Sequence, residues 1–375
     1  MADVLRAKYV AGRLEALCRP DGRDWADARA CHVLKGVVHG ALGSAQVVEG
    51  QSVLVAAVTA DIAPQLPHRV GYGRVEVAVS FSPLAAGSTG GSGDGPVAAA
   101  PSAPSARTTL LMTPAHVKQQ PRVSAGATQQ QQRLAKQWSQ EVEDALWTRY
   151  HAPSGSAKRE DSAAQPTRPV DFAALSLPAD AGAPPQCWRL LVEVVVLSLD
   201  AAGFDLCLVA TLSALHNTVL PELVHNGTTH PERRLALSGV VPVVCTSVLF
   251  ADVADGASAA LIDPTAEETV ALPTVGRVTL TSTTSGATTV PSAAASQAAA
   301  VVRMTLVWQR DDERIAASAA VGDDERPLIV DVSVTHVGRS SGPTASLPRN
   351  ALSLDAMEQH MRRGALARLH GITSR

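Results

Sequence analysis

Three stretches of biased composition divide this chain and limit which parts of it can fold. Residues 84–132 begin as a Gly/Ser/Ala/Pro run and end in four glutamines, residues 152–169 are rich in Ser, Ala and Pro, and residues 281–300 in Ser, Thr and Ala. Such stretches bury too little apolar surface to offset the entropy lost on ordering, so we predict disordered surface insertions. The remaining part, roughly 280 residues, has the size of one decorated domain, and we assign residues 1–375 to a single domain.

The core of this domain must be aliphatic, because hydrophobic residues make up 46% of the chain but aromatic residues only 3%. The formal net charge of −3 lacks the overall basic character of a stand-alone nucleic-acid-binding protein. Contact with RNA would therefore require a local basic patch or partner chains.

Cysteine usage and hydropathy predict a soluble intracellular protein. The five cysteines are dispersed without a Cys-x-x-Cys pair, which favours reduced thiols over disulfides or a zinc site. The first residues lack the apolar stretch of a signal peptide, and the most apolar segment, residues 190–199, is too short to cross a bilayer. We expect no membrane association, no bound metal and no cofactor.

The hydrophobic periodicity predicts a succession of strands and helices that is typical of an α+β fold and not of a strict βαβ repeat. Helices are expected at residues 4–17, 133–150, 205–220 and 354–369, and strands at residues 29–38, 44–48, 52–59, 75–81, 189–199, 243–251, 259–263, 277–281, 301–308 and 328–335. A compact hairpin is expected at residues 49–51, where Gly50 separates two β-type runs.

Motifs for phosphate or metal chemistry are weak. The Gly-rich run at residues 87–95 lacks the lysine and the following helix of a P-loop, so it is better explained as a flexible insertion. His225 and His230 lie in a Gly/Thr/Pro loop without a third ligand nearby, which favours surface histidines.

An acidic cluster, Asp263, Glu267 and Glu268, follows a predicted strand and allows two interpretations. Three carboxylates at a strand end suit Mg²⁺ binding or acid–base chemistry. Thr265 and Glu268, however, have the spacing of a capping box, and acidic residues in a first helical turn stabilise the helix dipole. The spacing favours the structural interpretation.

Several segments, taken in order, form a recognisable series. They are Arg19-Pro-Asp-Gly-Arg23, residues 43–55 (GSAQVVEGQSVLV), 188–200 (WRLLVEVVVLSLD), 203–205 (GFD), 214–221 (ALHNTVLP), 241–243 (VPV) and 261–268 (LIDPTAEE). This series resembles the ribonuclease-PH-like subunits of the RNA exosome ring. Each motif alone is weak, but the ordered set, which covers roughly residues 4–275, is fairly specific.

The resemblance implies a ribonuclease-PH-like domain with duplicated βαβ-type sheets. It also implies three kinds of partner, namely other such subunits in a hetero-hexameric ring, cap subunits that carry RNA-binding domains, and RNA. Phosphorolytic members have a basic phosphate loop and further aspartates downstream of the acidic cluster, whereas residues 269–289 here contain no Asp or Glu. The Asp263-Pro-Thr-x-Glu-Glu pattern instead resembles the catalytically silent subunits. The resemblance thus implies a non-catalytic structural subunit for RNA degradation and rRNA processing, in nucleus, nucleolus and cytoplasm.

In silent subunits of this family, arginines near the interface help to hold RNA. The matching zone, between the helix expected to end at residue 150 and residues 170–175, predicts RNA contacts for Arg149 and Arg168, since arginine binds phosphate in a bidentate manner. Arg69 and Arg74 are further candidates, because they flank the strand predicted from Val75 and could face a pore. Solvent-facing arginines without a ligand are the alternative. At the level of function, the alternatives are an active phosphate-dependent 3′-exoribonuclease, with Asp263, Glu267 or Glu268 as the acid, and an unrelated α+β protein.

Overall fold

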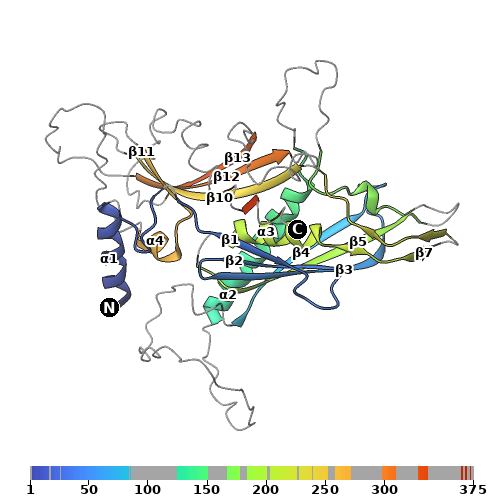
Figure 1. Ribbon diagram of the computed structural model, residues 1–375, viewed down its shortest axis with the longest axis horizontal. Helices are drawn as coiled ribbons and strands as arrows, with labels where there is room; N and C mark the ends of the chain where they lie inside the picture. The colour runs from blue at the N-terminus through green and yellow to red at the C-terminus, as the bar shows by residue number, and fades with distance from the viewer. Residues whose placement is uncertain are drawn as a thin grey trace, which may run out of the picture.

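The fold is seen in a computed structural model. The described residues are 2–16, 18–25, 27–83, 85, 125–150, 167–177, 184–200, 203–225, 228–238, 240–251, 258–271, 298–309 and 328–336, together with Ala365, Arg368, Leu369 and Ile372 of a C-terminal helix. They form two β-sheets with helices between and beside them (Figure 1). The predicted α+β class is therefore confirmed.

The larger sheet has five strands in the order β1-β2-β3-β5-β4. These strands are β1 (Cys31–Lys35), β2 (Gly43–Glu49), β3 (Ser52–Pro64), β4 (Arg74–Phe81) and β5 (Gln186–Ser198). Neighbours run antiparallel except β4 and β5, which are parallel. The expected hairpin joins β2 to β3 through Gly50, whose φ of 58° lies in the left-handed region that glycine adopts without strain.

The smaller sheet has four strands in the order β11-β10-β12-β13, all antiparallel. Its strands are β10 (Val240–Ala251), β11 (Ser258–Ile262), β12 (Ala298–Gln309) and β13 (Leu328–His336). Two short antiparallel pairs lie outside both sheets, β6 (Val219–Leu220) with β9 (Arg233–Arg234) and β7 (Leu223–His225) with β8 (Thr228–His230).

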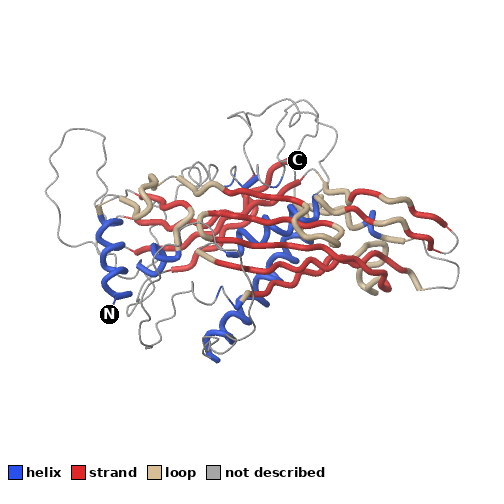
Figure 2. Tube along the Cα trace, turned by 60° about the horizontal axis from the view of Figure 1, so that its bottom comes forward, coloured by secondary structure: helices blue, strands red, loops and turns tan. Residues whose placement is uncertain are grey.

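The helices are α1 (Ala2–Glu15), α2 (Ala125–Trp147), α3 (Gly203–His216) and α4 (Ala266–Ala271), with a short 3₁₀ turn at Ala173–Leu175. Helix α3 lies between the two sheets, and all its residues from Gly203 to Leu215 are buried (Figures 1 and 2). Helix α2 packs on β4 and touches α3. A side chain at Gly203 would meet the Trp138 ring of α2, so glycine permits this close contact.

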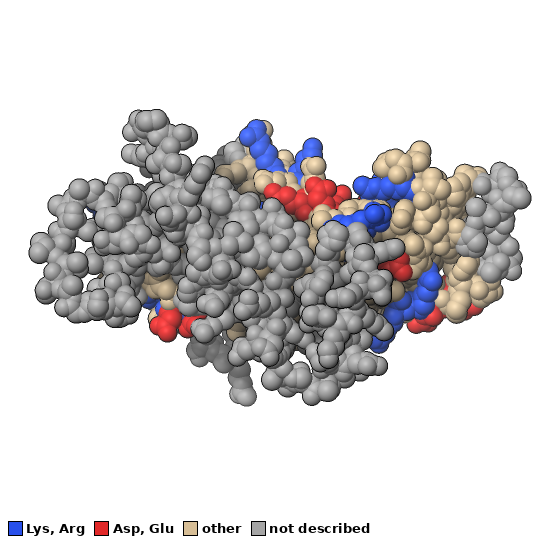
Figure 3. Space-filling view, turned by 90° about the horizontal axis from the view of Figure 1, so that it is seen from above, with Lys and Arg blue, Asp and Glu red and all other residues tan. Residues whose placement is uncertain are grey.

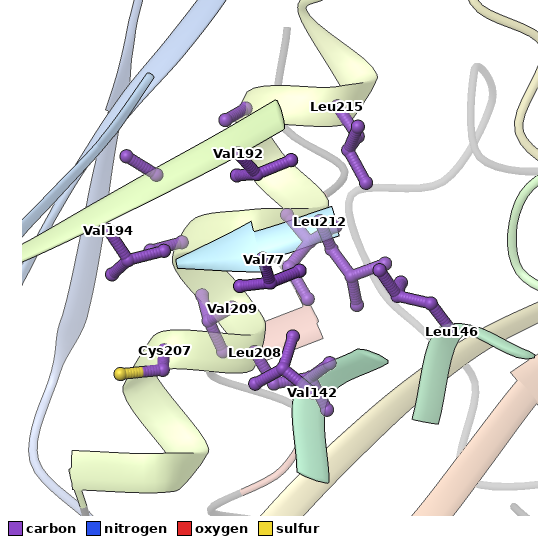
Figure 4. Close-up of a cluster of buried hydrophobic side chains, with 14 of the residues drawn as sticks. Val77, Val142, Leu146, Val192, Val194, Cys207, Leu208, Val209, Leu212 and Leu215 are labelled. Carbon is purple, nitrogen blue, oxygen red and sulfur yellow. The ribbon is translucent and has the colours of Figure 1, made fainter. Parts of the chain in front are cut away.

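The main core fills the space between α2, α3 and the sheets, and it is aliphatic as expected. In Figure 4, valines of β4 and β5 face a cluster of leucines and valines on α3, with Val142 and Leu146 of α2 beside them. Alternation of buried and less buried residues along β3 and β5 directs every second side chain toward this core. The periodicity that predicted these strands is thus the pattern of their burial.

Two predicted helix boundaries are wrong. Helix α3 ends at His216 and not near Leu220, because the next residues leave the helix to pair in β6 and the amide of Val219 donates to the carbonyl of Leu42. Helix α2 begins at Ala125, so residues 125–132 are helical although they were assigned to an insertion. The run of glutamines belongs to this helix, since glutamine is compatible with helical structure.

Other boundaries of the predicted insertions also shift. Thr167 forms a β-bridge with Tyr150, so residues 167–169 belong to the described structure, and β12 begins at Ala298. The rest of the ranges 84–132, 152–169 and 281–300, apart from residue 85 and the short segments above, lies outside the described residues, as does the strand predicted at 277–281. Of the predicted helix 354–369, only Ala365, Arg368 and Leu369 are described, and they are helical.

Candidate functional site

A group of buried charges lies where the two sheets meet, and we call it the ionic hub. It consists of Arg19, Arg29, Glu49, Asp205, Asp263, Glu268 and Arg368, each no more than 8% exposed. Every arginine of the hub makes an ion pair with a carboxylate of the hub. The pairing within the hub therefore determines whether the carboxylates of the predicted acidic cluster are available for metal binding or acid–base chemistry.

Asp263 is held by arginine on several sides. Its carboxylate accepts hydrogen bonds from the backbone amide of Arg29 at 3.0 Å and from Nε and Nη2 of Arg29 at 2.7 Å each. Burial by itself would raise the pKa of Asp263, but these hydrogen bonds and the charges of Arg368 and Arg29 hold that pKa well below the usual range. Asp263 is therefore an ionised structural anchor.

Glu268 forms the predicted capping box, and it also binds Arg19 of the Arg-Pro-Asp-Gly-Arg motif. Its Oε2 accepts from the amide of Thr265 at 2.8 Å, while the Glu268 amide donates to Thr265 Oγ1 at 3.2 Å. Arg19 donates from Nε and Nη2 to the two carboxylate oxygens at 2.9 and 2.8 Å. Glu267, the remaining acid, is partly exposed and pairs with Arg6 of α1. The structural interpretation of the cluster is confirmed for Glu268.

Arg368 links the hub to both sheets. It donates to Glu49 of β2 at 2.9 and 3.1 Å, to Asp205 of α3 at 2.9 Å and to the carbonyl of Val244 in β10 at 2.8 Å. A charge buried this deeply is stable only when paired and hydrogen-bonded. Arg368 thus helps to anchor the described residues of the C-terminal helix between the sheets.

A second arginine-containing group lies at the other end of the larger sheet, and we call it the arginine–aromatic cluster. It consists of Arg69, Tyr72, Trp147, Arg168 and Phe172. The Phe172 ring stacks on the Trp147 ring at 3.9 Å between centroids, and the Arg69 guanidinium carbon lies 3.8 Å from the same Trp147 centroid. At these distances Phe172 and Arg69 must occupy opposite faces of the indole ring, which holds the Arg69 guanidinium in place.

Arg168 completes the cluster. Its guanidinium carbon lies 4.9 Å from the Trp147 ring centroid and 5.1 Å from that of Tyr72, and its Nε donates to the Trp147 carbonyl at 3.1 Å. Two backbone hydrogen bonds between Tyr150 and Thr167, at 2.8 and 2.9 Å, bring this segment back beside the end of α2. Arg149 immediately precedes that bridge and is exposed. The structure therefore places Arg149, Arg168 and Arg69 in one region.

Arg74 does not join this group, because its guanidinium pairs with Glu76 on the same strand. Within the residues that the structure describes, Arg69, Arg149 and Arg168 form no ion pair with a carboxylate. Figure 3 shows basic and acidic side chains interspersed on the described part of one face, without a continuous basic stripe. The cluster is thus a local source of positive charge on a chain whose net charge is −3.

Sequence reasoning identified the arginines of the cluster but not its rings. Tyr72, Trp147 and Phe172 come from a loop, a helix end and the start of a 3₁₀ turn, and no local pattern connects them. Their scarcity was a usable signal, since the chain has only 5 Trp, 3 Tyr and 4 Phe. A Tyr three residues after Arg69 and a Trp two residues before Arg149 therefore marked both arginines.

The sequence was compared with protein families and with curated proteins. No family model matches the sequence, and no curated protein does. Among the described residues, no helix is long and apolar enough to span a membrane.

Two solved structures share the fold over nearly the whole chain. A chain of the Archaeoglobus fulgidus exosome with RNA bound to the active site is 16% identical, with 97% of this chain and 96% of that chain covered and a TM-score of 0.54. A chain of an archaeal exosome core is 15% identical, with 100% and 98% covered and a TM-score of 0.55. At such identities the likeness is one of fold. The chain therefore has the ribonuclease-PH-like α+β fold found in exosome core subunits.

Proposed function

We propose that this chain is a non-catalytic structural subunit of an exosome-type ring that contacts RNA through the arginine–aromatic cluster. One observation carries the proposal: each carboxylate of the acidic cluster is paired with arginine, whereas Arg69 and Arg168 rest on aromatic rings and pair with no described carboxylate. The fold shared with exosome core chains supports the assembly.

The pairing of the acids argues against phosphorolysis by this chain. Cleavage by phosphate needs an acid that protonates the leaving 3′-oxygen, within hydrogen-bonding reach of it. Asp263 and Glu268 are 1% and 0% exposed, and their carboxylates are bound by Arg29 and Arg19. Glu267 is 43% exposed on its side chain, but it pairs with Arg6 of α1. The three candidate acids are thus occupied in holding α1, α4 and the loop before β1 together.

The cluster has the properties of a phosphate and RNA contact. A guanidinium held on a ring keeps its outer N–H groups in a fixed fork, which matches the oxygens of a phosphate. Trp147 and Phe172 restrict Arg69 before any ligand arrives, so less entropy is lost on binding. Arg168 lies against the same ring, and Arg149, exposed two residues after Trp147, adds a further positive charge near the end of α2.

The proposed partners are other ribonuclease-PH-like subunits in a hetero-hexameric ring, cap subunits with RNA-binding domains, and RNA. The proposed setting is RNA degradation and rRNA processing in the nucleus, nucleolus and cytoplasm. The chain's own share of this work is to build the ring and to guide RNA, while cleavage belongs to a neighbouring chain or an associated nuclease.

The test is affinity purification of the tagged chain at low salt, with the partners identified by mass spectrometry. We expect other ribonuclease-PH-like chains and RNA-binding cap subunits. The isolated chain is then incubated with RNA and phosphate, and we expect no nucleoside diphosphates. Phosphate-dependent release that is abolished by Glu267→Gln would instead establish the active 3′-exoribonuclease. Recovery without any ribonuclease-PH-like partner would contradict the scaffold role.

A further inference from the structure

The larger sheet ends in two edge strands, β4 and β1, which differ in how their outward backbone groups are hydrogen-bonded. On β4, the outward-facing amides of Val77 and Val79 donate to side chains of α2, to Glu143 Oε1 at 2.7 Å and to Ser139 Oγ at 2.9 Å. Ser139 Oγ in turn donates to the carbonyl of Ala135 at 2.8 Å, which fixes it as an acceptor for Val79. Helix α2 therefore takes the place of a further strand and closes this edge.

On β1, the outward backbone groups of Cys31 and Val33 have no such cover from the described part of the chain. The register pairs His32 with Val48 and Leu34 with Gln46, and the amide of Gly36 donates to Ser44 in the same register. In an antiparallel pair, hydrogen-bonded positions alternate, so Cys31 and Val33 direct their amide and carbonyl groups outward. Among the described residues, no side chain or backbone group hydrogen-bonds to these outward groups of Cys31 and Val33.

Exposed apolar side chains border this edge. Leu34 is 58% exposed on the strand itself, and Val37, just beyond it, is 40% exposed. An uncovered edge strand with apolar neighbours pairs readily with another chain, and stable proteins usually cover or charge such an edge. Here the sheet can grow in one direction only, because its other edge is closed by α2.

We propose that β1 is an assembly edge: it pairs, backbone to backbone, with an extended segment of a neighbouring ribonuclease-PH-like subunit. This inference rests on the proposed ring. The occupant is an extended strand, because the outward groups of Cys31 and Val33 need a backbone with the spacing of a β-strand. A hydrophobic side chain of the occupant lies beside Leu34 and removes it from water.

The decisive variant is Val33→Pro. The Val33 amide makes no hydrogen bond within its own sheet, so proline removes only the outward donor, and proline is tolerated at such edge positions. His32, which precedes it, is already in an extended strand, as a residue before proline prefers. The matched control Val33→Thr keeps the amide and the β-branched shape. Ser139→Ala, on the closed edge, serves as a second control.

The experiment measures how much of the neighbouring ring subunits each tagged full-length variant recovers at low salt, together with its melting temperature. The loss of one intermolecular hydrogen bond, which leaves a carbonyl of the occupant without its donor, predicts about tenfold lower recovery for Val33→Pro at an unchanged melting temperature. Val33→Thr and Ser139→Ala are expected to recover the ring subunits as the unaltered chain does. Equal recovery by Val33→Pro would overturn the inference.

Amide hydrogen exchange at Val33 covers the case in which the proline variant fails to fold. In the unaltered free chain this amide is expected to exchange fast, and in the purified ring slowly; exchange that stays fast in the ring also overturns the inference. If the unaltered chain recovers no ribonuclease-PH-like subunit, the proposed function itself is wrong. If it instead forms a dimer with itself that Val33→Pro weakens, the edge pairs with a second copy and the proposed neighbour is wrong.

Discussion

The ionic hub and the arginine–aromatic cluster are both built on arginine, but they differ in what the arginines touch. In the hub, Arg19, Arg29 and Arg368 are buried and each guanidinium meets carboxylates. In the cluster, Arg69 and Arg168 are partly exposed and lie on rings. A buried pair satisfies its own charge and holds elements together, whereas a ring orients a guanidinium and leaves its charge available to a ligand.

This contrast explains how a chain without net positive charge can still bind RNA locally. In the hub, acidic and basic side chains offset each other's charge. The hub therefore contributes little to the electrostatic field outside the protein. The arginines of the cluster add positive charge and form no ion pair with a described carboxylate. Experiments that remove one arginine from each region should therefore separate stability from binding.

Loss of Arg368 should have the largest effect. Arg368→Met removes the cation that binds the buried carboxylates of Glu49 and Asp205, and we expect the free energy of unfolding to fall by about 3–5 kcal/mol, measured by urea denaturation. The matched change Arg69→Met removes one contact between a cation and a ring and should lower the same quantity by only about 0.5–1 kcal/mol. Similar losses for both variants would remove the distinction between the regions.

The second prediction concerns acid stability. Because the pKa of Asp263 is lowered in the folded chain, its contribution to stability is complete above the usual aspartate pKa, about 3.9, and is lost as the pH falls toward the depressed value. In Asp263→Asn, the free energy of unfolding should therefore be about 3 kcal/mol lower at neutral pH. Below pH 4 it should also decrease less steeply with falling pH than in the unaltered chain. The measurement is urea denaturation from pH 3 to 7.

Two features make that comparison specific. The pKa of Glu49 is raised by burial, which acts in the opposite direction, so the quantity of interest is the difference between the two proteins at each pH. Asp21→Asn is a suitable control, since Asp21 pairs with Arg23 at a partly exposed site. A difference between unaltered chain and Asp263→Asn that stays constant with pH would refute the role given to this carboxylate.

Third, we expect the double variant Arg69→Ala/Arg168→Ala to bind single-stranded RNA about tenfold more weakly in the assembled ring, while the free energy of unfolding falls by only about 1–2 kcal/mol. Two lost phosphate contacts should reduce the slope of log affinity against log salt by about 1.4. Arg74→Ala is the control, because Arg74 pairs with Glu76 and lies outside the cluster. An equal loss for Arg74→Ala would place the RNA elsewhere on this end of the molecule.

The smallest effect belongs to the ring that orients the arginine. Trp147→Leu keeps every charge but removes the surface on which Arg69 rests, and RNA affinity should fall about threefold, in line with one contact between a cation and a ring. The salt slope should stay as in the unaltered chain, because no phosphate contact is lost. A reduced slope would show that Trp147 acts through charge placement and not through restriction of Arg69.

How much the sequence predicts differs between elements. The strands of the core and the capping box at Thr265 and Glu268 follow from local periodicity and spacing, and they were anticipated. The early start of α2 and the early end of α3 were not, because the first depends on low-complexity residues joining a helix and the second on pairing with a distant strand.

The candidate site was predicted only in part, for a similar reason. Arg168 follows from the family resemblance and Arg69 from its place beside a predicted strand, but their common support on Trp147 depends on a loop, a helix end and a bridge between Tyr150 and Thr167. The partners of Arg368 lie in β2, α3 and β10, separated by long stretches of sequence. Contacts of this kind are decided by packing between elements, which no window of sequence contains.

The most direct test of the account is ultraviolet crosslinking of single-stranded RNA to the assembled ring, with the crosslinked peptides of this chain identified by mass spectrometry. The account predicts crosslinks in the peptides that contain Tyr72 and Trp147, where the arginines of the cluster lie beside aromatic rings. Crosslinks confined to other subunits, or to the α1 and α4 end of this chain, would contradict it.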